Sequence, residues 1–169
     1  MIEIRIHGRG GQGAVTAAQL LAIAAFYDGK YAQAFPMFGV ERRGAPATSF
    51  VRIDDKPINS REQIYSPDYV LVFDPSLIKM IDAKKGVKEE VLVNTNKKIN
   101  GCYGQDLTDK AMKILGKPII NTLILGMFAG RTKLVSLESL KKAVDQVFEG
   151  DIAMKNKKAI EEAYNEANV

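Results

Sequence analysis

The residues best suited to do chemistry are three glycines near the N-terminus, in the pattern Gly8-x-Gly10-x-x-Gly13. The run Ile2–Ile6 before them alternates between apolar and charged residues and predicts a β-strand, and the unbroken run Ala14–Phe26 after them predicts a helix. A strand, a glycine turn and a helix in this order aim backbone N–H groups and a helix N-terminus at an anion. The stretch therefore predicts an anion-binding turn.

The candidate site is the whole turn, in which the side chain of Arg9 joins the backbone donors of the glycines. Its residues are Gly8, Arg9, Gly10, Gly11, Gln12 and Gly13. His7, the only histidine of the chain, ends the preceding strand. It could contact the same anion, although a structural histidine that is satisfied within the fold is the favoured interpretation.

The same glycine spacing fits the dinucleotide-binding fingerprint, which also needs an acidic residue near the end of the second strand to hold the ribose. The second predicted strand, Tyr31–Phe35, continues into Pro36, and Asp28 precedes it. Because no acidic residue stands at the required place, nicotinamide or flavin dinucleotide binding is disfavoured. A third interpretation is that the glycines only let the first helix approach the sheet.

The composition predicts an ordinary globular protein. The chain has 169 residues, of which 46% are hydrophobic and 26% charged, enough for one domain with a core. Its net charge of +4 comes from scattered lysines, whereas a nucleic-acid surface would need them clustered with aromatic residues. We therefore expect no nucleic-acid partner.

The chain has a single cysteine, Cys102, and a single histidine. One thiol cannot form an intrachain disulfide or hold an iron–sulfur cluster, and a zinc site built from cysteine and histidine alone is excluded. The N-terminus lacks a charged leader before an apolar core, and no apolar run reaches about 18 residues. We expect a cytoplasmic protein with no membrane contact, no metal site and no catalytic residue of its own.

The remaining sequence predicts an alternation of strands and helices. Strands are expected at 47–53, 69–73, 90–94 and, more weakly, 99–103, and helices at 76–82, 106–115, 121–130, 136–148 and 155–166. The strands at 31–35 and 47–53 are joined without a helix, so they could be antiparallel. The expected fold is α/β: a single three-layer α/β/α domain over residues 1–169 with a mixed, mostly parallel sheet.

The first predicted helix lacks the charged outer face of a solvent-exposed helix. Its outer face carries Gln19, Ile23, Phe26 and Tyr27. We therefore expect another element or another chain to cover this face.

The helix predicted at 121–130 contains Gly126 and Gly130 on one face. Glycine inside a helix costs about 1 kcal/mol, and a close backbone contact would explain both. The alternative is that Gly130 simply ends the helix.

A charged loop follows the second predicted strand, between Pro36 and Pro46. Its residues Glu41, Arg42 and Arg43 allow two interpretations. Either they form a local surface salt bridge, or one arginine pairs with Glu41 while the other reaches a carboxylate or phosphate of a partner. The flanking prolines stiffen the loop and favour the second interpretation.

Two motifs together resemble the gamma subunits of the 2-oxoacid:ferredoxin oxidoreductase family. They are His7-Gly8-Arg9-Gly10-Gly11-Gln12-Gly13-Ala14 and Phe38-Gly39-Val40-Glu41-Arg42-Arg43-Gly44-Ala45-Pro46. The resemblance continues through Asp74-Pro75, Asn121 with the Gly126 helix, and the segment Asn156–Tyr164. The second motif is similar to the pyruvate:ferredoxin oxidoreductase (pyruvate synthase) branch; 2-oxoisovalerate enzymes are harder to exclude than 2-oxoglutarate enzymes.

The resemblance implies an anaerobic enzyme of alpha, beta, gamma and delta subunits that converts a 2-oxoacid and coenzyme A to an acyl-CoA while reducing ferredoxin. Thiamine diphosphate, Mg²⁺ and iron–sulfur clusters would reside on partner subunits, and this chain would hold none alone. Coenzyme A carries phosphate groups, so it is the ligand that the glycine turn would contact. The alternative is that the turn packs against the catalytic subunits without touching phosphate.

Overall fold

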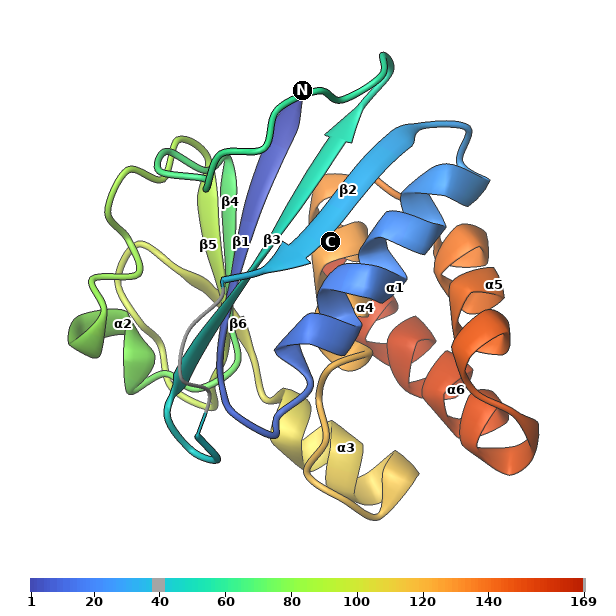
Figure 1. Ribbon diagram of the computed structural model, residues 1–169. Coiled ribbons are helices and arrows are strands. Elements are labelled where there is room, and N and C mark those ends of the chain that lie inside the picture. The colour runs from blue at the N-terminus through green and yellow to red at the C-terminus, as the bar shows by residue number, and fades with distance from the viewer. Residues whose placement is uncertain (38–41, 169) are drawn as a thin grey trace.

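The computed structural model describes residues 1–37 and 42–168, which form one six-stranded sheet with helices against it (Figure 1). The strands are β1 (Ile2–Arg9), β2 (Tyr31–Pro36), β3 (Pro46–Asp54), β4 (Tyr69–Val72), β5 (Glu90–Asn94) and β6 (Tyr103–Gln105). The helices are α1 (Ala14–Tyr27), α2 (Leu77–Met80), α3 (Leu107–Leu115), α4 (Leu123–Thr132), α5 (Leu137–Val147) and α6 (Gly150–Ala167).

The strand order is β2-β3-β1-β4-β5-β6. β1, β4, β5 and β6 pair in parallel, whereas β3 is antiparallel to both β1 and β2. The predicted α/β class with a mixed, mostly parallel sheet is confirmed, and so is the antiparallel pairing of the second and third strands.

The two faces of the sheet are covered unequally (Figure 1). The main hydrophobic core unites one face with α1, α3, α4, α5 and α6. On the other face, a smaller cluster joins β4 and β5 to α2, which has only four residues. The outer layer on this side is therefore thin. No helix of the described residues is both long and apolar enough to span a bilayer.

Several elements differ from the sequence prediction at their ends, and two of the differences have a clear physical reason. The strand expected at 99–103 is β6, shifted toward the C-terminus, because Gly101 adopts a left-handed conformation with φ of 71° and the chain turns there. The last helix begins at Gly150 rather than at residue 155. Ala153 is buried and Lys155 pairs with Asp151 at 2.9 Å, so the additional turn has both packing and an i,i+4 ion pair.

The glycines of α4 lie against the backbone of α6. A Cβ atom on Gly126 would overlap with the carbonyl oxygen of Ile160, and one on Gly130 with that of Tyr164. α4 continues past Gly130 to Thr132, so this glycine does not end the helix. The expected close backbone contact is confirmed for both positions.

Candidate functional site

The fold brings the glycine turn and the charged loop together, although about 30 residues separate them. The amide of Gly10 donates to the carbonyl of Ala45 at 2.8 Å, and the amide of Gly44 donates to the carbonyl of Gly10 at 3.0 Å. A Cβ atom on Gly10 would overlap with the carbonyl oxygen of Arg42. Glycine is therefore required at position 10 because the chain's own loop lies against it.

Packing contacts within the chain also explain why glycine occupies positions 8 and 13 of the turn. A Cβ atom on Gly8 would lie 3.3 Å from the Cβ of Ala14, so this glycine lets α1 start close to β1. Gly13 has a φ of 85° and faces the side-chain amide of Asn121, which a Cβ would meet at 2.8 Å. These contacts support the interpretation that the glycines allow close approach, and they leave a role in ligand binding open to test.

Arg9 ties three segments together. Its Nε donates to Oδ2 of Asp74 at 2.7 Å, one terminal nitrogen donates to Oγ of Ser76 at 2.7 Å, and the other to the carbonyl of Gly44 at 3.0 Å. The amide of Arg9 also donates to Oε1 of Gln12 at 2.7 Å, which closes the turn. The guanidinium retains further N–H groups for another acceptor.

The carboxylate of Asp74 is stabilised in its charged form. Burial raises its pKa, but hydrogen bonds from Arg9 and Ser76 outweigh that effect and hold the pKa below its usual value. From the sequence alone, Asp74 is part of the family resemblance only, directly after the strand expected at 69–73, and has no predicted role in the site. Its position directly after a strand could have indicated a place in the site, because the carboxyl ends of the adjacent parallel strands β1 and β4 lie at the same edge of the sheet.

A shallow hollow of about 260 Å³ opens where the turn meets α1. Its lining residues are Arg9, Gly10, Gly11, Gly13, Ala14, Val15 and Ala47. α1 has no side-chain cap at Gly13 and no acidic residue in its first turn, so its N-terminal N–H groups and its positive dipole end are not neutralised locally. This arrangement suits an anion.

The sheet order argues against dinucleotide binding. In the dinucleotide-binding fold, the first two strands are adjacent and the pyrophosphate crosses the second glycine of the fingerprint. Here β3 lies between β1 and β2, and the loop at Arg42 occupies the space beside Gly10. The independent nucleotide-binding alternative therefore lacks both the ribose-binding acid and the expected crevice.

His7 has a structural environment. Its side chain is 6% exposed, and Nδ1 lies 3.1 Å from Oγ1 of Thr48, while Nε2 has no hydrogen-bond partner among the described residues. Burial, and then the nearby charge of Arg5, lower the pKa of His7 to about 4. The imidazole is neutral at pH 7 and does not line the hollow, which favours the structural interpretation.

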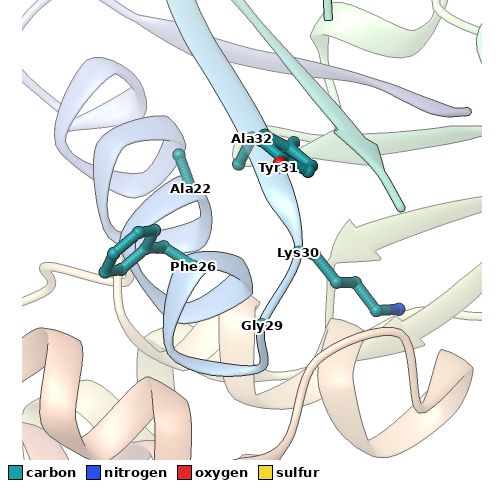
Figure 2. A pocket seen from close by; sticks show the side chains of 6 residues that line it. All are labelled: Ala22, Phe26, Gly29, Lys30, Tyr31 and Ala32. Atoms are coloured by element: carbon teal, nitrogen blue, oxygen red, sulfur yellow. The ribbon is translucent and has the colours of Figure 1, made fainter. Parts of the chain in front are cut away.

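The outer face of α1 is only partly covered. Phe26 and Tyr27 are 72% and 44% exposed and Gln19 is exposed, whereas Ile23 packs against the core. The hydroxyl of Tyr27 lies 3.4 Å from Oε1 of Gln146 on α5, a weak contact. Figure 2 shows the ring of Phe26 standing beside the groove between α1 and β2. Large apolar rings in solvent are consistent with a surface that another chain covers.

Of the charged triplet, the structure describes Arg42 and Arg43, both exposed beside the turn. Glu41 lies outside the described residues, so its predicted pairing with an arginine stays a prediction. Among the residues that the structure describes, no cluster of three or more histidine, cysteine or carboxylate side chains could hold a metal ion.

Comparisons with known proteins agree on one family. The family model for "Pyruvate ferredoxin/flavodoxin oxidoreductase" matches residues 3–166. The chain is 56% identical over 172 residues to the pyruvate synthase subunit PorC of Methanocaldococcus jannaschii, covering 98% of this chain and 97% of that protein. It is 54% identical over 182 residues to the pyruvate/ketoisovalerate oxidoreductases common subunit gamma of Thermococcus kodakarensis, covering 100% and 98%.

The fold has close counterparts among solved structures. The pyruvate oxidoreductase subunit PORC of Thermotoga maritima aligns with a TM-score of 0.81 and 35% identity over 97% of this chain and 95% of that one. A 2-oxoglutarate:ferredoxin oxidoreductase of Magnetococcus marinus aligns with the same TM-score at 17% identity, and it shares the fold alone. The family model and the relatives both span nearly the whole chain. The chain therefore belongs to the pyruvate ferredoxin/flavodoxin oxidoreductase family.

Proposed function

We propose that this chain is the gamma subunit of a pyruvate:ferredoxin oxidoreductase (pyruvate synthase), which converts pyruvate and coenzyme A to acetyl-CoA and CO2 while oxidised ferredoxin takes up the electrons. The observation that carries the proposal is the 56% identity to a pyruvate synthase subunit over nearly the full length of both chains. The doubled arginine at Arg42 and Arg43 is similar to the pyruvate branch of the family and supports the same substrate.

The role of the chain is accessory, and residues 1–169 act as one domain within a cytoplasmic complex. Its partners are alpha, beta and delta subunits, and ferredoxin meets the complex rather than this chain. Thiamine diphosphate, Mg²⁺ and iron–sulfur clusters belong to those partners. The single cysteine, Cys102, supports this division because it cannot hold a cluster.

Coenzyme A is the ligand that fits the hollow at the turn. The uncapped N-terminus of α1 and the remaining N–H groups of Arg9 suit a phosphate group of this substrate. In the competing interpretation, the turn packs against the catalytic subunits. The contacts of Gly8, Gly10 and Gly13 with their own chain are compatible with either.

Two surfaces are proposed to contact partner subunits. The first is the α1 face of Gln19, Ile23, Phe26 and Tyr27, supported by the exposure of the two aromatic rings. The second is the charged segment of Glu41, Arg42 and Arg43, whose two arginines lie next to the turn and would reach a carboxylate or phosphate.

A second substrate has specific support. A relative at 54% identity is named a common subunit of pyruvate and ketoisovalerate oxidoreductases, so a gamma chain of this type can serve two enzymes. The alternative is therefore that this chain assembles with a 2-oxoisovalerate oxidoreductase as well. No comparable observation favours 2-oxoglutarate.

The test is isolation of the tagged chain from native anaerobic extract. We expect three further subunits to co-purify and the preparation to reduce ferredoxin when pyruvate and coenzyme A are added. Recovery of the chain alone, or binding of a nicotinamide or flavin dinucleotide at micromolar affinity by calorimetry, would instead support an independent nucleotide-binding domain.

A further inference from the structure

Strand β2 lies at one edge of the sheet with its outer side open. It pairs with β3, and no other described strand pairs with it. Natural proteins usually protect such an edge with charged residues or a bulge, because its unpaired backbone groups would bind another strand. β2 has no charged residue and no bulge: its sequence, Tyr31-Ala32-Gln33-Ala34-Phe35-Pro36, pairs with β3 without interruption, and its one safeguard is the proline at its last position.

The register shows which backbone groups of β2 face outward. The amide of Met37 donates to the carbonyl of Thr48 on the β3 side at 2.8 Å. Hydrogen-bonding direction alternates along an antiparallel strand, so Gln33 and Phe35 also point their backbone groups toward β3. The N–H and C=O groups of Ala32 and Ala34 therefore point away from the sheet.

The end of the strand is consistent with this assignment. Pro36 has no N–H, and its position in the alternation is outward, where the loss leaves the pairing with β3 intact. The proline also limits any outside pairing to the part of β2 that precedes it. The available segment is thus Tyr31–Phe35.

This segment reads the same in both directions by residue type: aromatic, alanine, glutamine, alanine, aromatic. We propose that the outer edge of β2 binds β2 of a second copy of this chain, antiparallel, about a two-fold axis at Gln33. Ala32 of each copy then exchanges backbone hydrogen bonds with Ala34 of the other. Tyr31 faces Phe35 of the second copy, and the two Gln33 side chains face each other.

The side chains around the edge are compatible with a second strand. Ala32 and Ala34 turn toward the helix layer and pack on the main core, so only methyl groups flank the edge on that face. On the other face, Gln33 accepts a hydrogen bond from Arg52 and Phe35 stacks on Phe50 at 5.1 Å, which fixes their orientation.

The ends of the segment avoid repulsion between like charges. Lys30 would face Pro36 of the second copy, and its Nζ already donates to the carbonyl of Leu134 at 3.3 Å. Tyr31 is 50% exposed and, by strand alternation, shares the face of Gln33 and Phe35, with its ring on the side of β2 away from α1 (Figure 2). Phe35 of the second copy would cover it there.

The first test is sedimentation of the purified full chain. The wild type is expected to form a dimer whose population rises with concentration, and Ala34→Pro is expected to remain monomeric. The proline removes an outward N–H that β3 does not use, so its circular dichroism should match the wild type. Ala34→Ser is the matched control, because it keeps the N–H and should keep the dimer.

The second test does not depend on the fold of the proline variant. With Cys102→Ser as background, Gln33→Cys places two thiols opposite each other across the axis, at a non-hydrogen-bonded pair with Cα atoms about 4.5 Å apart. Mild oxidation is expected to link two copies, whereas Glu138→Cys, at a side chain 76% exposed on α5, should not link.

Two results would overturn the proposal. One is a monomeric wild type at every soluble concentration together with no disulfide through residue 33. The other is a cross-link in the assembled enzyme between β2 and a different subunit, which would make that subunit the occupant of the edge. The outcome is independent of the substrate, so failure here would leave the assignment to pyruvate synthase intact.

Discussion

Nε of Arg9 lies 2.7 Å from Oδ2 of Asp74, and this pair joins the glycine turn to the end of β4. The same guanidinium bonds to Ser76 and to the carbonyl of Gly44, so one side chain fixes the position of three loops. Arg9 therefore has two candidate roles at the centre of the site. It holds the turn in shape, and its remaining N–H groups are available to bind a phosphate.

The first prediction separates the structural role of Arg9 from its phosphate-binding role. We expect Arg9→Ala to raise KM for coenzyme A roughly tenfold in the reconstituted complex, since a charge-assisted hydrogen bond contributes about 1.5–3 kcal/mol. KM for pyruvate should hardly change, because in the proposed complex pyruvate would react on thiamine diphosphate held by a partner subunit. Steady-state kinetics in both substrates measures the ratio.

Asp74→Asn is the control for this prediction, because it removes the countercharge and leaves Arg9 present. If Arg9 binds phosphate, coenzyme A affinity should be kept or improved in this variant. If both variants weaken coenzyme A equally, Arg9 only shapes the turn. No change in either KM for Arg9→Ala, with the complex intact, would contradict the phosphate role, whereas an equal loss for both substrates would indicate faulty assembly.

The second prediction concerns the crossing of α4 and α6. Gly126→Ala should lower the free energy of unfolding by about 3 kcal/mol, even though alanine favours helices, because its Cβ would overlap with the carbonyl of Ile160. Gly29→Ala is the comparison: its Cβ meets no atom within 4 Å, and only the left-handed backbone costs about 1 kcal/mol. Urea denaturation of the two variants measures both free energies of unfolding. An equal decrease in the two variants would contradict the prediction and show that α6 can move away from Gly126 at little cost in free energy.

Much of the fold could be predicted from the sequence, because hydrophobic periodicity and breakers report local structure. The strand at Glu90–Asn94 matches its prediction at both ends. The position of β3 between β1 and β2 could not be predicted, since it depends on pairing between distant segments. For the same reason the sequence placed the glycine turn and Arg42 in separate motifs, and only the fold shows that Gly10 is a glycine because Arg42 lies on it.

The third prediction follows from the buried His7. Its folded pKa of about 4 lies below the value of 6.5 expected when unfolded, so the unfolded chain binds the extra proton between these values. Stability should therefore fall as the pH drops from 6.5 toward 4, by about 3 kcal/mol in total for this group.

Unfolding measured across this pH range in wild type and His7→Asn tests the effect. Asparagine can retain the contact with Thr48 but does not titrate, so its curve should be flatter between pH 6.5 and 4. Parallel curves would show that other groups cause the loss of stability.

The fourth prediction tests the α1 surface. Phe26→Glu should weaken assembly with the other subunits and leave the folding of the isolated chain nearly unchanged, because the ring is 72% exposed. Tyr65→Glu is a matched control, since that ring is also 72% exposed and lies away from α1. Quantitative co-purification of both variants measures assembly. Equal recovery of the complex would argue against a partner at Phe26.

The central claim is that this chain works only as part of a pyruvate-oxidising complex. The most direct measurement is ferredoxin or viologen reduction with pyruvate and coenzyme A by the chain alone, by the other subunits without it, and by the reconstituted complex. We predict turnover only when all subunits are present, with kcat/KM for pyruvate above that for 2-oxoglutarate. Turnover by the isolated chain, or an unchanged rate when the chain is omitted, would contradict the account.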